Sequence, residues 1–111
     1  MRERDIEAEL VKRVKQLGGE IRKVKWVGRD GAPDRVVMLP LATMDYVSLN
    51  GELHYGRPST IWIEVKRPGG AATFPANAHE RKQAREHRRM QAMGQRVEVV
   101  DSFERIEEIL A

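Results

Sequence analysis

The sequence predicts a single α/β domain over residues 1–111, with the element order α-β-β-β-α-β, a hairpin extension and a C-terminal helix. Three observations carry this prediction. A length of 111 residues suits one compact domain and leaves no room for a second. Helix start and stop signals frame three segments of the chain. Short apolar or alternating runs, typical of strands, lie between those segments.

The first helix is expected from Glu3 to Leu17, where apolar residues recur at three- and four-residue spacing. Those residues are Ile6, Leu10, Val14 and Leu17. Gly18-Gly19 then supplies the stop. At about 100° per residue, Glu3 and Glu7 fall on the apolar side, while Glu9 points away. Glu3 is expected to reach water at the fraying end of the helix. For Glu7 two interpretations stay open: a functional residue that faces the site, or a solvent-exposed residue at the edge of the apolar stripe.

Two strands are expected next, separated by a loop. The first covers residues 21–27 and places Val24 and Trp26 on one face. The loop of residues 28–33 is rich in glycine and closed by a proline. Residues 34–39 are almost continuously apolar and are expected to form the second strand.

A hairpin extension and a third core strand follow. Asn50-Gly51 is a strong turn signal between Tyr46-Val47 and Leu53-His54-Tyr55. Residues 61–66 then alternate, so that side chains of opposite character fall on the two faces of a strand. These faces are Ile61, Ile63 and Val65 on one side, and Trp62, Glu64 and Lys66 on the other.

A second helix is expected after a loop over residues 67–77. Asn77 and Glu80 have capping-box spacing and open a helix over residues 78–93, which Gly94 closes. The arginines of this helix point away from the side that carries Gln83, His87 and Met90. That side is therefore expected to face the sheet.

The chain closes with a short strand over residues 97–100 and a helix that ends at Leu110. Asp101 or Ser102 caps this helix, and Asp101 and Glu104 again have capping-box spacing. No internal repeat or linker is present, so one domain accounts for the whole sequence.

The composition excludes several classes of protein. No apolar run reaches the roughly 18 residues of a membrane span, and no signal-peptide pattern precedes the first helix. The sequence has no cysteine, which excludes disulfides and cysteine nucleophiles and fits a reducing cytoplasm. A formal net charge of +3 is compatible with a polyanionic partner but does not identify one.

The residues that best account for chemistry are Asp34, Glu64 and Lys66. Asp34 begins a strand after a tight loop, while Glu64 and Lys66 share one face of another strand. Two carboxylates from adjacent strands offer the hard oxygen ligands that Mg²⁺ prefers. A nearby lysine can hold the attacking water and offset the charge that develops on a phosphate. This pattern is typical of phosphodiester hydrolysis.

A plainer interpretation treats Glu64 and Lys66 as solvent-facing strand residues and Asp34 as a turn residue. Two further residues weigh against it. Glu7 lies on the inner stripe of the first helix, where a carboxylate can complete a metal shell. Gln83 points inward from the second helix, where an amide can orient Lys66 or a water.

Taken together, the ordered motifs resemble the VRR-NUC family, the virus-type replication-repair nuclease branch of the PD-(D/E)xK superfamily. The similarity covers nearly the whole chain apart from the hairpin region and the loop over residues 70–77. Each motif is weak singly, but the ordered set is fairly specific. The matching segments are residues 6–11, 31–35, 63–69, 83–87 and 94–102.

The resemblance implies a restriction-endonuclease-like core and an endonuclease that cleaves DNA with Mg²⁺ or Mn²⁺. Acidic site residues and metal contacts would be Glu7, Asp34 and Glu64, together with the backbone carbonyl of Val65. Lys66 would be the catalytic lysine and Gln83 a supporting polar residue. The resemblance further implies a phage-encoded homodimer that acts on branched or structured DNA in the host cytoplasm.

Other conspicuous residues have simpler interpretations. Trp26 and Trp62 are interpreted as core residues, and His87 as a packed histidine rather than a metal ligand. Basic residues that are candidates for contacts with DNA phosphates are Arg35, Arg67, Arg81, Arg85 and Arg88. For those on the second helix, a solvated face explains the charge just as simply.

Two functions of other classes compete with the nuclease. A nucleic-acid-binding module that keeps the fold without turnover would bind DNA independently of metal and with strong salt dependence. A basic structural protein would explain the charge but would leave Asp34, Glu64 and Lys66 without a role.

Overall fold

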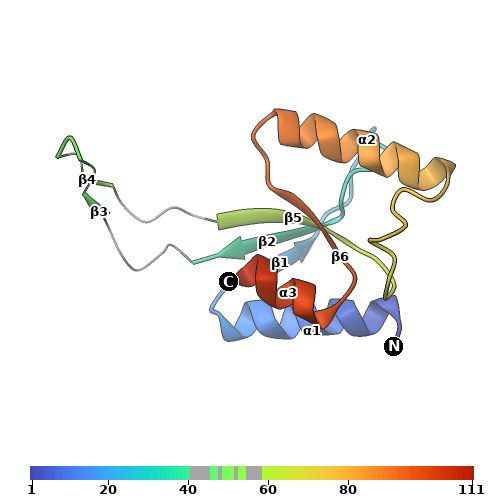
Figure 1. Cartoon of the computed structure of the whole chain (residues 1–111), viewed down its shortest axis with the longest axis horizontal. Helices are drawn as coiled ribbons and strands as arrows, with labels where there is room; N and C mark the ends of the chain where they lie inside the picture. The colour runs from blue at the N-terminus through green and yellow to red at the C-terminus, as the bar shows by residue number, and fades with distance from the viewer. Residues whose placement is uncertain (41–45, 48, 52, 55–58) are drawn as a thin grey trace.

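The computed structural model describes residues 1–40, 46–47, 49–51, 53–54 and 59–111, and its elements follow the predicted order (Figure 1). The helices are α1 (Glu3–Gln16), α2 (Ala78–Ala92) and α3 (Phe103–Leu110). The strands are β1 (Glu20–Lys23), β2 (Arg35–Leu39), β3 (Tyr46–Val47), β4 (Leu53–His54), β5 (Ser59–Val65) and β6 (Val97–Val100). The α/β fold class predicted from the sequence is therefore confirmed.

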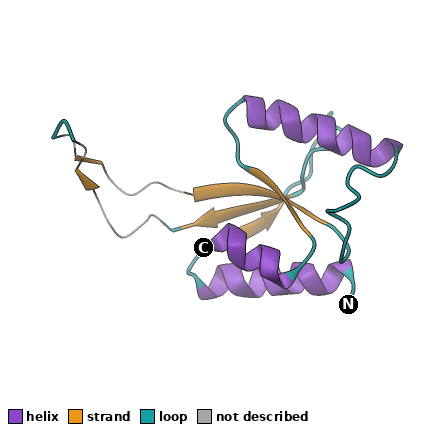
Figure 2. Ribbon diagram, in the orientation of Figure 1, coloured by secondary structure: helices purple, strands orange, loops and turns teal. Residues whose placement is uncertain are grey.

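Four strands form one mixed sheet in the order β1-β2-β5-β6. β1 pairs with β2 and β2 with β5 in antiparallel fashion, whereas β5 and β6 are parallel. Helices cover both faces, with α1 and α3 on one side and α2 on the other (Figure 2). β5 lies between β2 and β6, so residues on its two faces look toward different helices.

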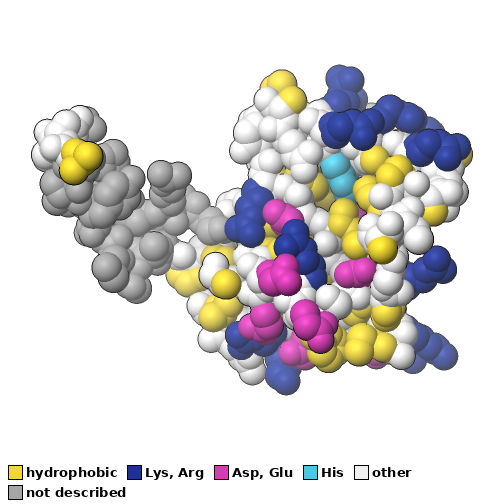
Figure 3. Space-filling view, viewed as in Figure 1, with side chains coloured by type: hydrophobic (Ala, Val, Ile, Leu, Met, Phe, Trp, Pro, Cys, Tyr) yellow, Lys and Arg dark blue, Asp and Glu magenta, His cyan; other side chains and the backbone are white. Residues whose placement is uncertain are grey.

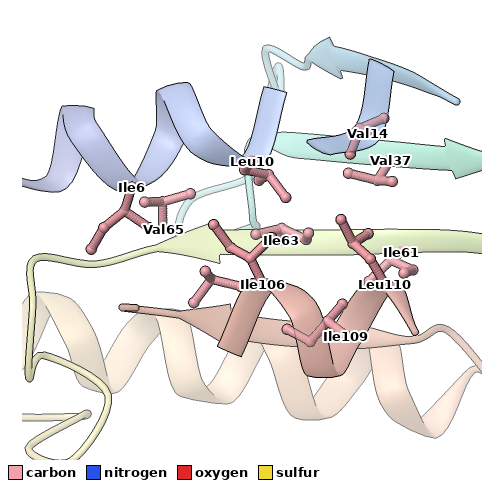
Figure 4. Packing of buried hydrophobic residues seen from close by; sticks show 11 residues of the cluster. Ile6, Leu10, Val14, Val37, Ile61, Ile63, Val65, Ile106, Ile109 and Leu110 are labelled. Atoms are coloured by element: carbon pink, nitrogen blue, oxygen red, sulfur yellow. The ribbon is translucent and has the colours of Figure 1, made fainter. Parts of the chain in front are cut away.

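The hydrophobic core lies between the sheet and the pair α1 and α3 (Figure 4). From β5 it receives Ile61, Ile63 and Val65, which confirms the alternation predicted for this strand. The helices contribute apolar residues at helical spacing, as expected of amphipathic helices on a core. These are Ile6, Leu10 and Val14 from α1, and Ile106, Ile109 and Leu110 from α3.

The first strand is shorter than predicted: it ends at Lys23 and not at residue 27. Its partner β2 begins at Arg35, which is paired with Lys23, and one further backbone hydrogen bond follows, from the Val24 N–H to the Asp34 carbonyl at 2.8 Å. The expectation that Val24 and Trp26 share a strand face was therefore wrong. Trp26 instead donates its indole N–H to the carbonyl of Pro33, 2.8 Å away.

The caps of α2 and α3 use the residues predicted, with two changes. The Asn77 side chain accepts the Glu80 N–H at 2.9 Å, but the Glu80 carboxylate accepts from Ala76, one residue before the capping-box position. Ser102 caps α3 by accepting the Arg105 N–H at 3.1 Å. Asp101 is not the cap, because its carboxylate accepts the N–H of Ala71, a residue far away in sequence.

The hairpin forms a separate two-stranded sheet, drawn to the left of the main body in Figure 1. Tyr46 pairs with His54 and Val47 with Leu53, and Gly51 has the positive φ of +84° that the turn requires. Tyr55, predicted as part of the second hairpin strand, lies outside the described residues. In the part of the chain that is described, no helix is long and apolar enough to span a membrane.

Candidate active site

The central strands bring Asp34 and Glu64 to neighbouring positions. The β2–β5 ladder pairs Arg35 with Ile63, so the same register continued by one residue sets Asp34 opposite Glu64. Glu64 is buried, at 9% exposure, on the side of the sheet covered by α2. Asp34 is more open, with half of its side chain exposed. A buried and an accessible carboxylate thus belong to residues at opposed positions at the ends of two adjacent strands.

Lys66 follows directly on β5 and is held by two side chains of α2. Its Nζ donates to Gln83 Oε1 at 2.7 Å and lies 3.0 Å from Glu80 Oε2. The ammonium also lies over the ring of Phe74, 5.2 Å from the centroid. The predicted contact between Lys66 and Gln83 is therefore present, and three groups fix the position of the amine.

His87 completes the polar row between β5 and α2. Its Nε2 lies 3.4 Å from Glu64 Oε1, and its ring stacks on Phe74 with centroids 5.6 Å apart. At that distance the hydrogen bond is weak. The histidine is buried, as predicted, and it is the polar partner of Glu64 among the described residues.

Arg35 joins Glu7 of α1 to Asp34. Its Nη1 is 3.0 Å from Asp34 Oδ1, and its Nε is 3.1 Å from Glu7 Oε1, with a second short contact from Nη2 to the same Glu7 oxygen. The guanidinium is only 11% exposed. Glu7 is therefore linked to Asp34 through a partly buried cation, and no contact in the described residues joins it to Glu64.

Two acidic residues near Lys66, Glu3 and Glu80, were not predicted as site residues. A cleft of about 230 Å³ opens beside Lys66 and Arg67, and both Glu3 and Glu80 line it. Glu3 was assigned to solvent, and Glu80 was recognised only as part of a cap. The signal that was available is spacing, since Glu80 precedes Gln83 by three residues and so shares its side of α2.

The donor set fits a hard divalent cation. Glu64 is a buried carboxylate whose polar partner is a weak one, and Asp34 offers accessible oxygens at the next position in the sheet. Among the residues described here, no three His, Cys, Asp or Glu side chains are already gathered as a metal cluster. A metal at this place would thus rest on Asp34 and Glu64 with further oxygen ligands, such as waters.

Comparisons with known proteins agree with this geometry. No family model matches the sequence. The "Putative nuclease p44" of Acyrthosiphon pisum secondary endosymbiont phage 1 is 37% identical over 102 residues, covering 92% of this chain and 85% of the phage protein. A solved structure described as a VRR_NUC domain superposes with a TM-score of 0.63 at 26% identity, covering 97% of this chain and 92% of that one. The chain belongs to the VRR-NUC family. The family predicted from the sequence is confirmed.

The basic residues of this VRR-NUC domain divide into two groups. Arg81, Arg85 and Arg88 are exposed, and basic side chains gather over α2 in Figure 3. Arg67 is likewise exposed and lines the cleft beside Lys66. Arg35 differs, because its guanidinium is engaged by Glu7 and Asp34. Its position suits the fixing of the strand end better than a contact with DNA.

The loop that precedes Asp34 is fastened to α2 by two ion pairs. Lys82 Nζ lies 3.1 Å from Asp30 Oδ2, and Arg29 Nε lies 2.7 Å from Glu86 Oε1. Between them, Gly31 has a φ of +85° and approaches the helix so closely that an added Cβ would lie 3.1 Å from the Lys82 backbone. The VRR-NUC site therefore depends on a loop seated directly on the helix that carries Gln83.

Gly31→Ala is expected to destabilise the domain and to lower nuclease activity. The substitution adds the cost of a positive φ, about 1–2 kcal/mol, to a clash with the backbone beside Gln83. Gly28→Ala is the matched control, because Gly28 also has a positive φ but no atom near its added Cβ. Urea denaturation and cleavage rates compare the two. Equal losses of stability and activity would contradict the importance of this close approach.

The Arg29–Glu86 pair makes a pH-dependent contribution to stability. The hydrogen bond from Arg29 lowers the pKa of the Glu86 carboxyl below its ordinary value of about 4.3. The contribution is thus fully present above about pH 4.3 and is lost as the pH falls through the lower folded-state pKa. In urea denaturation, the stability difference between the wild type and Glu86→Gln should shrink as the pH drops from about 6 toward about 3. A constant difference would refute this expectation.

Proposed function

We propose that this VRR-NUC domain is a divalent-metal-dependent endonuclease that hydrolyses phosphodiester bonds in DNA, with a preference for structured or branched substrates. The observation that carries the proposal is the placement of Lys66. Its amine is held by Gln83 and Glu80 of α2. Lys66 follows directly on β5, two residues after Glu64, which lies opposite Asp34 in the sheet register. An amine fixed beside two carboxylates is what phosphodiester hydrolysis requires.

In this proposal Asp34 and Glu64 hold Mg²⁺ or Mn²⁺, with the Val65 carbonyl as a further ligand. The bound metal supplies charge neutralisation and activates water. Glu7 acts indirectly, because Arg35 forms ion pairs with both Glu7 and Asp34. It therefore positions the Asp34 strand end, and a direct metal contact by Glu7 requires Arg35 to move aside.

Lys66 orients the attacking water and stabilises the negative charge of the phosphorane-like transition state. Hydrolysis forms a bond from the water oxygen to phosphorus and breaks one ester bond, whose leaving oxygen takes up a proton. Gln83 fixes the Lys66 amine by accepting from it, and Glu80 forms an ion pair with it. The backbone N–H of Lys66 donates to the Val100 carbonyl at 2.8 Å, which also fixes the main chain at this point.

The exposed arginines of α2, together with Arg67, provide contacts for DNA phosphates. The proposal extends to a homodimer, since a domain of this size offers limited surface for gripping a duplex. The phage origin of the p44 relative supports a role in phage DNA metabolism in the cytoplasm of the host.

The deciding test is cleavage of labelled duplex, single-stranded, flap and four-way-junction DNA in Mg²⁺, Mn²⁺ or EDTA. Cleavage is expected with either metal and is expected to stop in EDTA, with flap or junction DNA cut faster than linear duplex. Light scattering of the same sample tests the dimer. Salt-sensitive DNA binding without cleavage of any substrate would instead favour a non-catalytic binding module.

A further inference from the structure

A second hollow lies on the α2 side of the sheet, further along the helix from Lys66. Its volume is about 510 Å³, within the range of pockets that bind small organic groups. Its lining combines apolar side chains with polar and charged ones. These include Trp26, Trp62, Met90 and Met93, with Arg29 and Arg89 beside them. We call it the tryptophan hollow.

The two indole rings that line the hollow are fixed in place. Their centroids are 5.3 Å apart, with 46° between the planes. Trp26 donates its N–H to Pro33 and Trp62 donates to Gln95 Oε1 at 3.1 Å. The interpretation of both tryptophans as core residues was wrong, because each is only partly buried and neither belongs to the core cluster. With their N–H groups engaged inside the protein, the rings offer aromatic surface to an occupant.

Two arginines and one glutamate, Glu86, line the hollow, so its net charge favours an anionic occupant. Arg29 is 44% exposed although it is paired with Glu86, and Arg89 is exposed on α2. A purely apolar ligand would gain nothing from guanidinium groups, whereas a nucleotide unites a flat ring that stacks with a phosphate that binds arginine. The lining is therefore complementary to a base and its flanking phosphates.

The hollow also lies close to the candidate active site. Trp62 precedes Glu64 by two residues and lies on the same face of β5. That spacing corresponds to about 6.6 Å along the strand, or roughly two nucleotide steps at the rise of a stacked strand. Along α2 the same order holds, since His87 contacts Glu64 and Met90 lines the hollow.

We propose that the tryptophan hollow binds an unpaired nucleobase of the substrate, stacked on an indole ring beside the phosphate to be cleaved. The inference rests on the proposed function, because its occupant is part of the nucleic acid. A base inside a duplex is already stacked and paired and has to be extruded, whereas an unpaired base enters without that cost. The hollow thus gives a physical reason for a preference for flaps, junctions or single strands.

The chain provides its own reporter for this proposal, because its only two tryptophans both line the hollow. In EDTA, a labelled single-stranded oligonucleotide is titrated with the protein and its anisotropy reports binding. In a second titration, the oligonucleotide is added to a fixed concentration of protein and tryptophan emission reports the hollow. Saturable quenching is expected with single-stranded DNA. A blunt duplex, and a single strand with abasic residues in place of bases, are expected to raise anisotropy with little quenching.

Variants separate stacking from general affinity. Trp26→Ala is expected to weaken single-strand binding about tenfold, whereas Trp26→Phe retains most of the affinity because it keeps an aromatic ring. Phe103→Ala is the control, because this exposed aromatic residue begins α3 on the other side of the sheet. Circular dichroism verifies that each variant is folded.

Each other outcome overturns the proposal in a distinguishable way. Anisotropy that rises with unchanged tryptophan emission, together with full affinity in Trp26→Ala, removes the base-binding role but leaves the nuclease proposal standing. No binding of any DNA by anisotropy also removes the base-binding role, and the nuclease proposal is then decided by the cleavage assay in Mg²⁺ or Mn²⁺. Emission that changes with protein concentration alone, without DNA, shows that a second copy of the chain occupies the hollow.

Discussion

Replacing Lys66 by alanine is expected to lower the rate of DNA cleavage by about 10²–10³-fold while the domain stays folded. The loss follows from removal of the positive charge that faces the reacting phosphate in the proposed mechanism. Glu80 and Gln83 lose a partner, but Glu80 keeps its bond from the Ala76 N–H at 2.8 Å. The measurement is the single-turnover cleavage rate at saturating Mg²⁺, with circular dichroism and thermal melting on the same samples.

Lys12→Ala is the matched control for this experiment. Lys12 is a largely exposed lysine of α1, and its nearest carboxylate is Glu9 at 3.9 Å. Its removal is expected to leave cleavage unchanged. If Lys66→Ala cleaved DNA at the wild-type rate, the assignment of Lys66 as the catalytic lysine would fail, whatever the metal dependence.

Ile63→Ala is expected to reduce the free energy of unfolding by about 2–5 kcal/mol. Ile63 is fully buried at the centre of β5 and belongs to the core formed with α1 and α3. Shortening the side chain leaves a cavity between α1, α3 and β5, because these elements cannot all move inward to fill it. For a domain of this length, such a loss is a large part of the total stability. Urea denaturation followed by circular dichroism measures it.

Val27→Ala serves as the comparison, because Val27 is an apolar β-branched residue that is 91% exposed. Its truncation is expected to change the stability by less than about 0.5 kcal/mol. A similar small effect for Ile63→Ala would mean that β5 does not pack into the core as described.

Much of this site could be predicted because two periodicities are written directly in the sequence. The alternation along residues 61–66 predicted that Glu64 and Lys66 lie on the face opposite to the apolar one. In the structure they lie on that opposite face. The helical period likewise placed Gln83 inward, where its amide oxygen accepts from Lys66. Both patterns are local, so they need no knowledge of the partner elements.

What the sequence could not provide are contacts made between distant residues. Glu7 was correctly placed near the inner stripe, but its pairing with Arg35 depends on how α1 crosses β2. Asp101 was a plausible cap from its position in the sequence, but in the structure its carboxylate accepts a hydrogen bond from the Ala71 N–H. The early end of β1 has the same origin, because a strand extends only as far as its partner does.

The arrangement of the sheet separates the residues that hold the fold together from those that perform the proposed chemistry. The α1 and α3 side is apolar and supplies the buried core, whereas Lys66, Gln83, His87 and the tryptophan hollow lie on the α2 side. Substitutions of exposed residues on the α2 side are therefore expected to change nucleic-acid binding more than the stability of the core. Such a domain is well suited to diversification, since residues that determine its specificity can be substituted while the hydrophobic core stays unchanged.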